Sequence, residues 1–377
     1  MRIVFIITGL HTGGAEMMLL KVLTHLDRQR FQPLVISLTS LGALGANIAA
    51  LNIPVQALQL QGKLSDLAAL IRLVRLIKAF RPQLVHTWMY HADLLGGLAA
   101  RLAGVKAIAW CIRNSTLDAH STKRSTRLVV RVCAALSHRI PTRIISCSEQ
   151  ARRIHTDIGY AADKMTVIPN GFDLSRFQPD PAAYASVRKE LGLPEDALIV
   201  GLIGRYDPQK NHSGFLAAAS KIQAEFSHVH FVLAGKGVDH TNTALIHAAT
   251  TAGIAANCHW LGLRTDMPRL MAALDVLASA SLYGEAFPNV LGEAMACGVP
   301  CAVTDVGDSA YIVGSTGQVA PAGDTAALAA AITAILALSA DDRHALGQQA
   351  RQRVAEHFEI AAVVRQYEDV YKQLGAS

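Results

Sequence analysis

Short β-branched runs alternate with helical stretches along almost the whole chain, and this alternation constrains the fold more than any other feature. The runs expected to form strands lie at 3–7, 34–38, 84–87, 107–112, 143–147, 165–168, 198–203, 230–234, 258–261, 276–278, 301–303 and 318–320. Nearly continuous apolar strands, separated by helical patterns of roughly 10–20 residues, are typical of parallel sheets covered by helices on both faces. We therefore expect an α/β protein.

The alternation is interrupted at residues 169–184, PNGFDLSRFQPDPAAY, where prolines and a glycine without periodicity predict a linker. We expect an N-terminal Rossmann-like domain at 1–168 and a second one at 185–355. A C-terminal helix within 356–377 is expected to pack back toward the first domain. Two such domains would face each other across a cleft at the carboxyl ends of their strands, where ligands bind in these folds.

Composition narrows the class of protein. Apolar residues make up 51% of the chain and charged residues 17%, which argues against disorder. Met1 is followed directly by a strand-like run, so we expect no signal peptide. The apolar run Ala326–Ala340 is too short for a membrane span, and we expect a surface helix with Asp324 as its N-cap. The six cysteines include no CxxC pair, which favours reduced structural cysteines in a cytoplasmic protein.

Charge is distributed unevenly along the chain. Residues 1–170 contain 21 Lys or Arg and 8 Asp or Glu, a balance of +13, whereas the remainder carries −7. Within the basic part, residues 121–140 predict a helix with one basic and one apolar stripe. The basic stripe is Arg124, Arg127 and Arg131, and the apolar stripe is Leu128, Val132, Ala135 and Leu136. Either the apolar stripe packs in the core below a solvated basic face, or the helix docks on an anionic membrane surface. No nucleic-acid-reading motif accompanies the charge, so nucleic acid is not an expected partner.

The first strand is followed by a glycine-rich turn, ITGLHTGGAE at 7–16. Gly13 and Gly14 would let a ligand approach backbone N–H groups at a positive helix N-terminus. The dinucleotide fingerprint GxGxxG, with an acidic residue ending the second strand, is missing, which disfavours a NAD(P) enzyme. A tight turn without a ligand is the alternative.

The second domain carries the stronger signals. GLIGRYDPQKN (201–211) places Arg205 and Lys210 just past a strand, where a planar fork and a point charge suit a diphosphate. The alternative is a pair of solvated surface charges. LAGKG (233–237) follows the next strand, and Gly235 there would allow close backbone approach.

The segment EAFPNVLGE, residues 285–293, puts two carboxylates around a predicted helix start. Pro288 suits the first helical position, which would leave the N–H groups of Asn289, Val290 and Leu291 as an anion site. Glu285 and Glu293 would lie on opposite sides of that site. A phosphate at the helix terminus with a hydroxylated group toward each glutamate describes a nucleotide-sugar, and a buried structural glutamate is the alternative at either position. No DxD motif occurs and the two glutamates are too far apart to chelate, so we expect no metal ion; Arg205 and Lys210 would supply the positive charge.

Together these motifs resemble those of the GT-B glycosyltransferases of the family-4 type (GT4), over essentially the whole chain. The E-x7-E motif matches Glu285 to Glu293, and the Gly-Arg-x4-Lys element matches 204–210. The inter-domain Pro-Asn-Gly matches 169–171, and the N-terminal GGAE matches 13–16. The resemblance implies two Rossmann-like domains and a retaining glycosyltransferase that uses neither a metal nor another cofactor.

The resemblance also implies roles for individual residues. Glu285 would contact the hydroxyls of the donor sugar and Glu293 the ribose, while Arg205 and Lys210 would hold the diphosphate. Arg205, Lys210 and Glu285 are thus the catalytic candidates. The donor-binding candidates are Gly13, Gly14, Gly235, Asn289, Val290, Leu291 and Glu293.

Two positions depart from the family pattern. Ala286 replaces the usual glycine after the first glutamate. Many relatives have a histidine at the end of the fourth N-domain strand, where this chain has Ile112-Arg113-Asn114. Arg113 and His91 are the candidates to replace it, and Tyr90, His91 and Arg113 form the acceptor-side set. His86 is expected to be an ordinary core residue.

The expected function is transfer of a hexosyl or N-acetylhexosaminyl group from a nucleoside-diphosphate sugar, with UDP favoured over GDP. The acceptor would be a glycan or a lipid-linked glycan in cell-surface polysaccharide synthesis, either lipopolysaccharide or exopolysaccharide. The enzyme would be cytoplasmic and peripheral on the inner face of the cell membrane. The alternatives are a sugar-nucleotide epimerase on the same scaffold and a non-catalytic sugar-nucleotide-binding regulator.

Overall fold

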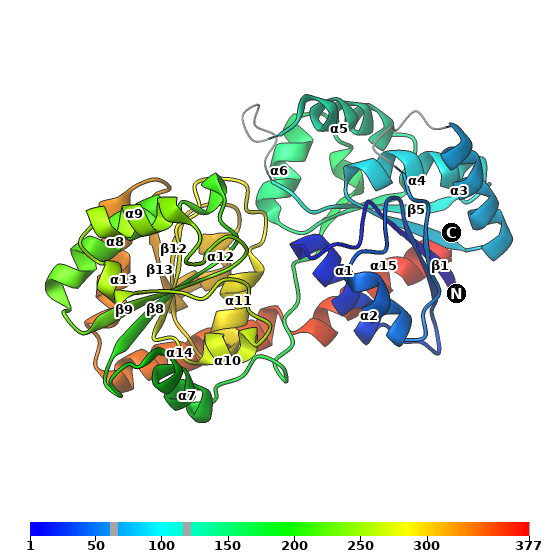
Figure 1. The fold of residues 1–377 in the computed structure, drawn as a ribbon. Coiled ribbons are helices and arrows are strands. Elements are labelled where there is room, and N and C mark those ends of the chain that lie inside the picture. The colour runs from blue at the N-terminus through cyan, green and yellow to red at the C-terminus, as the bar shows by residue number, and fades with distance from the viewer. Residues whose placement is uncertain (61–66, 116–121, 377) are drawn as a thin grey trace. The chain divides into compact units, whose positions relative to one another are not determined.

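The computed structural model describes residues 1–60, 67–115 and 122–376 and divides into two compact units (Figure 1). Unit 1 comprises Met1–Gly171 together with Ile360–Ser377, and unit 2 comprises Phe172–Glu359. The segment expected to be a linker, 169–184, already contains the start of a helix at Pro181, which follows Asp180 as its N-cap. Asp180 accepts hydrogen bonds from the N–H groups of Ala182 and Ala183, so local capping starts this helix earlier than composition suggested.

Unit 1 is built on a seven-stranded parallel sheet in the order β3-β2-β1-β4-β5-β6-β7. Its strands are β1 (Arg2–Ile7), β2 (Gln32–Ser37), β3 (Val55–Ala57), β4 (Leu84–Trp88), β5 (Ala107–Ile112), β6 (Arg143–Ser146) and β7 (Met165–Val167). Its helices are α1 (Gly14–His25), α2 (Leu44–Ala50), α3 (Leu67–Phe80), α4 (Tyr90–Leu102), α5 (Arg124–Ser137), α6 (Glu149–Asp157) and α15 (Ile360–Gly375), with a 3-10 turn η1 (Ala162–Lys164). The prediction missed β3, an edge strand whose three residues are too few to show a strand pattern.

Helices cover both faces of this sheet (Figure 1). Helices α1, α2 and α15 lie on one face and α3, α4 and α5 on the other, as right-handed crossovers from a sheet that reverses direction at β1 and β4 require. Helix α15 is tied to the sheet by the Tyr371 hydroxyl, 2.9 Å from Nδ1 of His86. His86 is fully buried, as expected of a core residue, and burial lowers its pKa to about 3.

Unit 2 is built on a six-stranded parallel sheet in the order β10-β9-β8-β11-β12-β13. Its strands are β8 (Leu198–Ile203), β9 (Val229–Ala234), β10 (Cys258–Trp260), β11 (Val276–Ser279), β12 (Cys301–Thr304) and β13 (Gly317–Ala320). Its helices are α7 (Pro181–Leu191), α8 (His212–Glu225), α9 (Thr243–Thr251), α10 (Met267–Ala272), α11 (Asn289–Ala296), α12 (Ser309–Val313), α13 (Thr325–Leu336) and α14 (Ala340–His357). Three 3-10 turns complete it: η2 (Pro208–Lys210), η3 (Ala255–Asn257) and η4 (Gly314–Thr316).

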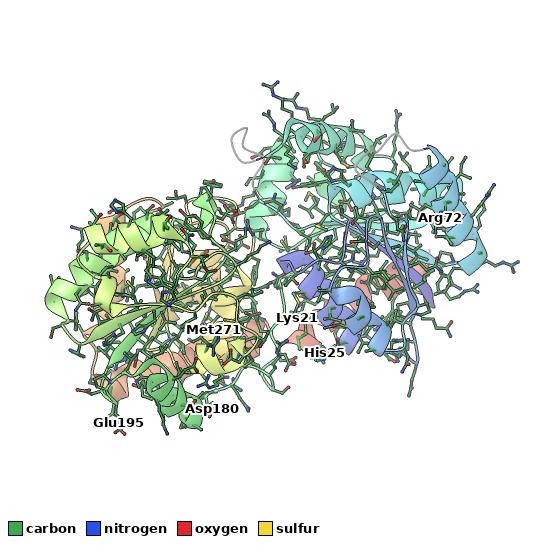
Figure 2. The ribbon with its side chains drawn as sticks, in the orientation of Figure 1. Lys21, His25, Arg72, Asp180, Glu195 and Met271 are labelled. Atoms are coloured by element: carbon green, nitrogen blue, oxygen red, sulfur yellow. The ribbon has the colours of Figure 1, made fainter. Side chains whose placement is uncertain are left out.

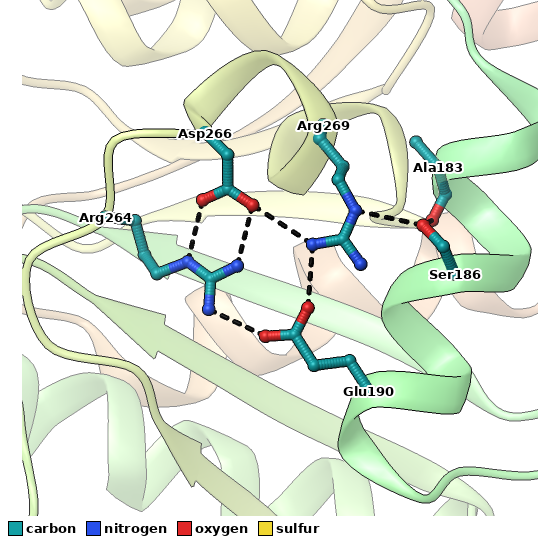
Figure 3. A network of polar contacts seen from close by, with 6 residues as sticks. All are labelled: Ala183, Ser186, Glu190, Arg264, Asp266 and Arg269. Atoms are coloured by element: carbon teal, nitrogen blue, oxygen red, sulfur yellow. Dashed lines mark hydrogen bonds and ion pairs between the residues drawn. The ribbon is translucent and has the colours of Figure 1, made fainter.

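A network of ion pairs fastens the loop after β10 to helix α7 (Figure 3). Arg264 donates to both oxygens of Asp266, at 2.8 and 2.7 Å, and to Glu190 of α7 at 2.7 Å. Arg269 donates to the other oxygen of Glu190 at 2.7 Å and to Asp266 at 3.0 Å. The bonds from Arg264 lower the pKa of Asp266 to about 2. This loop therefore has a fixed position beside the carboxyl edge of the sheet.

Helix α5 turns a different face to the core than the sequence suggested. Its buried residues are Val129, Val130, Cys133, Ala134 and Ser137. Leu128 is 63% exposed and Val132 37% exposed, and Ala135 is exposed as well. The interpretation that placed the stripe of Leu128, Val132 and Ala135 in the core is therefore wrong. A second set of small and β-branched residues packs instead. Of the predicted apolar stripe, Leu136 is half-buried, and the other three residues lie in solvent beside Arg124 and Arg131.

Helix α13 follows its predicted cap, because Asp324 accepts a hydrogen bond from the N–H of Ala327 at 2.9 Å. Among the described residues, no single helix has both the length and the apolar character that a membrane crossing requires; α13 and α14 meet that requirement only as a pair bent by 109°.

Candidate functional site

Each sheet reverses its winding direction at one pair of neighbouring strands, β1 and β4 in unit 1 and β8 and β11 in unit 2. Loops that leave such strands at their carboxyl ends diverge to opposite faces and leave a crevice that binds ligands. In unit 2, the loop after β8 contains Arg205 and Lys210, and the loop after β11 contains Glu285. The strongest sequence motifs therefore meet at the switch point of unit 2.

Lys210 and Glu285 form an ion pair across this switch point. Nζ of Lys210 lies 2.5 Å from Oε1 of Glu285, with side-chain exposures of 18% and 10%. Ser281 donates a second hydrogen bond, 3.0 Å long, to the same carboxylate oxygen. A carboxylate so little exposed to water needs such partners, because an unpaired buried charge would cost several kcal/mol. The pair brings one cation and one hydrogen-bond acceptor to the same point.

The loop after β8 is shaped to present Lys210. Asp207 caps the 3-10 turn η2 by accepting from the N–H of Gln209 at 3.0 Å. Asn211 adopts a left-handed conformation, with φ of 53°, and its side chain caps helix α8. A Cβ at Gly204 would lie 3.3 Å from methylene carbons of Lys210, so the glycine leaves room for the lysine stem.

Arg205 lies in the same loop but is directed elsewhere in this structure. Its guanidinium contacts Asp207 at 3.0 Å and Gln209 at 3.2 Å, and its side chain is 57% exposed. A surface pair of this kind is weak and easily exchanged for another anion. Lys210 and Glu285 are thus in direct contact, while Arg205 stays within its own loop.

Hydrogen bonds to its backbone carbonyls hold the loop that contains Glu285. Thr304 at the end of β12 donates to the carbonyl of Ser281 at 2.6 Å. The N–H of Asp308 donates to the carbonyl of Ala286 at 3.0 Å. Gly307 has a φ of 65°, and a Cβ there would overlap the carbonyl oxygen of Glu285. Only glycine fits this position without strain.

Helix α11 begins one residue later than predicted. Pro288 is its N-cap, with ψ of 116°, and the first helical residue is Asn289. The N–H of Leu291 donates to the carbonyl of Pro288 at 3.3 Å, so it does not belong to the open set predicted at Asn289, Val290 and Leu291. The error arises because proline is favoured both at the first helical position and just before it.

Aromatic packing fixes the start of α11. The ring of Phe172 stacks on Phe287, 6.3 Å between centroids, and Phe358 lies edge-on to both. A Cβ at Gly292 would overlap Phe172, so this glycine lets the ring lie against the first turns of the helix. Glu293, on the next position, is half-buried.

Gly235 has a structural use that differs from the predicted one. Its N–H donates to the carbonyl of Gly262 at 2.7 Å, so it is already engaged within unit 2. Its φ is 148°, and a Cβ there would overlap the carbonyl of Gly204. The glycine therefore allows two loops of the carboxyl edge to touch, and no ligand is needed to explain it.

His212 was missed by the sequence analysis. It lies two residues after Lys210, is only 2% exposed, and packs edge-on against Tyr206 with centroids 5.5 Å apart. Burial and the nearby charge of Lys210 lower its pKa to about 4, so the imidazole is neutral at pH 7. In the sequence, its position two residues after Lys210 was the only feature that could have drawn attention to His212.

In unit 1, the glycine-rich turn forms the N-terminus of α1, with Gly13 as its N-cap. A Cβ at Gly13 would overlap the carboxylate of Glu16, so the glycine makes room for this side chain. Burial raises the pKa of Glu16. The structure thus places an acid of the chain itself beside Gly13 and Gly14, where the sequence suggested a bound anion.

The acceptor-side candidates occupy different environments. Tyr90 is buried, and its hydroxyl lies 2.8 Å from Nε2 of the buried His155, which does not fit the predicted acceptor contact. The N-cap of the same helix, Met89, has a φ of 74°, a strained value for a side chain other than glycine. His91 is half-buried, and burial lowers its pKa.

The side chain of Arg113 contacts other residues of unit 1. Its guanidinium lies over the ring of Trp88, 5.0 Å from the centroid, and donates to the hydroxyl of Tyr367 at 3.3 Å and to the side chain of Asn170. These contacts tie α15 and the Pro-Asn-Gly segment to the sheet. They assign Arg113 a positioning role, and the sequence showed only that a cation follows β5.

The fold class follows from these observations. The chain forms two doubly wound parallel units, and unit 2 pairs a cation with a carboxylate at its switch point. Structural comparison agrees: HepE from Anabaena in complex with UDP superposes with a TM-score of 0.87 at 24% identity, over 99% of this chain and 100% of that one. The protein has the GT-B fold, as the sequence predicted.

Sequence comparison identifies the family. Residues 12–176 match the model described as Glycosyltransferase Family 4, and residues 197–338 match Glycosyl transferases group 1. The chain belongs to the family-4-type glycosyltransferases.

Two curated relatives illustrate the range of the match. The UDP-Gal:alpha-D-GlcNAc-diphosphoundecaprenol alpha-1,3-galactosyltransferase of Escherichia coli is 31% identical over 254 residues, which are 66% of this chain and 65% of that protein. The match thus spans slightly less than two thirds of the relative's length. Putative glycosyltransferase EpsF of Bacillus subtilis is 28% identical over 81% of this chain and 79% of its own.

The Gly307→Ala substitution tests whether the Glu285 loop depends on its backbone support. We expect a loss of about 1–3 kcal/mol in the free energy of unfolding, because the new methyl group is strained and displaces the Glu285 carbonyl. Nucleotide affinity should fall with it. Gly104→Ala, also at positive φ but with no atom within 4 Å of the added carbon, is the matched control for backbone strain alone. Equal losses in the two variants, measured by urea unfolding, would contradict this account.

Proposed function

We propose that this protein transfers a sugar from a nucleoside-diphosphate sugar to a glycan or lipid-linked acceptor with retention at the anomeric carbon. The observation that carries the proposal is the Lys210–Glu285 pair at the switch point of unit 2. A cation and a carboxylate at one point match a donor that combines a negative diphosphate with neutral hydroxyl groups.

Each site residue has a role in this proposal. Lys210 and Arg205 bind the diphosphate, together with backbone N–H groups at the start of α11. Glu285 accepts hydrogen bonds from the sugar hydroxyls, and Glu293 accepts from the ribose. Arg205 reaches the phosphates by exchanging its contact with Asp207, which solvent screening makes inexpensive.

The reaction follows from the same groups. The bond between the anomeric carbon and the diphosphate oxygen breaks, and the acceptor oxygen bonds to that carbon on the face that the diphosphate leaves. The acceptor hydroxyl passes its proton to a departing phosphate oxygen, so the products are the glycoside and the nucleoside diphosphate. Lys210 and Arg205 stabilise the charge that develops on the leaving group. We propose that these cations make a metal ion unnecessary.

Names of similar proteins support a finer assignment. The E. coli relative is named for a UDP-sugar donor and a diphosphoundecaprenol-linked acceptor. HepE, similar in fold, forms complexes with UDP and with UDP-glucose. We therefore propose UDP as the donor base and a lipid-linked glycan of cell-surface polysaccharide synthesis as the acceptor.

Substitutions at the ion pair test the catalytic assignment. Lys210→Met keeps the length of the side chain and should lower the rate of sugar transfer by about 10²–10³-fold, because one stabilising charge is lost from the leaving group. Glu285→Gln keeps the bond from Ser281 and should lower the rate through weaker sugar contacts. The assay is release of UDP from UDP-sugars with a GlcNAc-diphosphate lipid acceptor, and NMR of the product gives its anomeric configuration.

Lys189→Met on α7 is the control for a lost surface lysine, and it should keep full activity. Turnover by Lys210→Met within about threefold of the unaltered chain would refute the role of Lys210. An inverted product would refute retention. Binding of UDP-sugar without any transfer would favour the non-catalytic regulator.

We further propose that unit 1 docks on the anionic inner face of the cell membrane through the outer side of α5. Leu128 and Val132 are exposed next to the exposed Arg124 and Arg131, a combination typical of interfacial helices. Helix α3, on the same face of the sheet, adds exposed cations that include Arg72 (labelled in Figure 2). A lipid-linked acceptor would be encountered at that surface.

Vesicle co-sedimentation tests this docking. Arg124→Gln with Arg131→Gln should weaken binding to vesicles containing phosphatidylglycerol by about tenfold or more, at about 1 kcal/mol per charge. Leu128→Ser with Val132→Ser should weaken it as well, through lost burial of apolar side chains. Lys189→Gln with Lys221→Gln changes the net charge equally and should have little effect. Equal binding to neutral phosphatidylcholine vesicles would contradict the proposal.

A further inference from the structure

A cavity of about 460 Å³ opens at the amino edge of the unit 1 sheet, the edge opposite to the one that carries the motif loops. It lies where α3 ends, where α4 passes into β5, and where α15 ends. Its size is within the usual range for small-molecule sites, about 300–1,000 Å³. Nothing in the proposed sugar transfer uses this cavity.

Three cations line the cavity: Lys78, Arg81 and Lys106. No acidic residue lines it, and within the described part of the chain none of the three side chains has a hydrogen bond or an ion pair. Across residues 67–115 and 122–148, the only acidic side chain is the fully buried Asp93. A concave site with one sign of charge and apolar walls concentrates that charge's field, so the cavity attracts anions.

The backbone conformation of Arg81 indicates that this residue has a role beyond local structure. Arg81 has a φ of 51°, a left-handed conformation that usually selects glycine or asparagine just past a helix end. Its N–H closes helix α3 by donating to the carbonyl of Ile77 at 3.0 Å. An arginine here costs stability relative to glycine, so the local structure alone does not explain it.

Apart from Gln83 and Thr142, the other side chains that line the cavity are apolar, and they include Ile77, Val105 and Leu374. Leu102, at the end of α4 and next in sequence to the lining residue Ala103, is 60% exposed. A site that joins three unpaired cations to apolar walls fits an amphipathic anion better than a free inorganic ion. A phospholipid combines a phosphate with an apolar glycerol ester in this way.

We propose that this cavity binds the phosphate of an anionic phospholipid head group, with Lys78, Arg81 and Lys106 as its ligands. The site would hold a lipid of the same membrane on which α5 lies. This inference rests on the proposed contact of unit 1 with an anionic membrane, whichever helix makes that contact, and is independent of the proposed sugar transfer.

The test uses the full chain and dihexanoylphosphatidate, kept below its micelle concentration, in isothermal titration calorimetry. Excess UDP is present throughout, and inorganic phosphate is titrated in parallel. Arg81→Gly should weaken dihexanoylphosphatidate binding by about tenfold or more while leaving the thermal unfolding midpoint unchanged or higher, because glycine relieves the left-handed backbone. Lys78→Gln with Lys106→Gln should weaken binding further, and Lys189→Gln with Lys221→Gln should leave it unchanged.

The outcomes separate the alternatives. Inorganic phosphate bound as tightly as dihexanoylphosphatidate would overturn the assignment to a lipid. Lipid binding that survives in the Arg81→Gly and Lys78→Gln/Lys106→Gln variants would overturn the cavity as the site. Sugar transfer to a water-soluble acceptor should be unaffected in all of these variants, so a failure of the transferase proposal would be detected separately. Tight lipid binding that depends on Arg81, in a chain whose α5 variants still sediment normally with vesicles, would uphold this site and reject α5 as the docking helix.

Discussion

The ion pair between Lys210 and Glu285 is the interaction on which the proposed donor site depends. Both side chains are largely withdrawn from water, so each charge is stabilised by the other. The pair joins loops from β8 and β11, which are neighbours in the sheet but lie more than 70 residues apart in the chain. Parallel winding brings those loops together, and the pair then fixes a cation next to a hydrogen-bond acceptor.

Several glycines in unit 2 serve this arrangement. Gly204 leaves space for the lysine stem, Gly307 for the backbone of Glu285, and Gly235 for the contact of two loops at the carboxyl edge. The motifs of the second domain therefore combine groups that would touch a ligand with groups that only allow the loops to approach each other. Gly235 has the second use in this structure, in a sequence context that is the same as that of a ligand-binding glycine.

Much of the fold could be predicted because it follows from local patterns. Apolar runs of strand length gave all strands of both sheets except β3, whose pairing depends on its neighbour β2 and not on its own composition. The capping role of Asp324 was also readable locally. The sequence placed Lys210 and Glu285 in one donor site, but their direct 2.5 Å contact was not predicted, because it depends on loop conformation.

The predictions for Tyr90 and for helix α5 were wrong for a common physical reason. A sequence pattern predicts the period of a helix, but not which of its faces packs against the core. Tyr90 was assigned to the acceptor side, but it is buried and its hydroxyl lies beside His155. In α5, the sequence contains two apolar sets on different faces, and the set that includes Val129, Cys133 and Ala134 is the buried one. Leu128 and Val132 are left in solvent, an arrangement that costs free energy unless another surface covers them.

We propose that the Lys210–Glu285 pair receives an activated sugar, and a crystal structure of the full chain bound to an intact UDP-sugar tests this directly. We expect a diphosphate oxygen about 3 Å from Nζ of Lys210 and a sugar hydroxyl at the same range from the carboxylate of Glu285. A bound nucleotide that leaves this pair untouched, with its phosphates on other groups, would refute the proposed site.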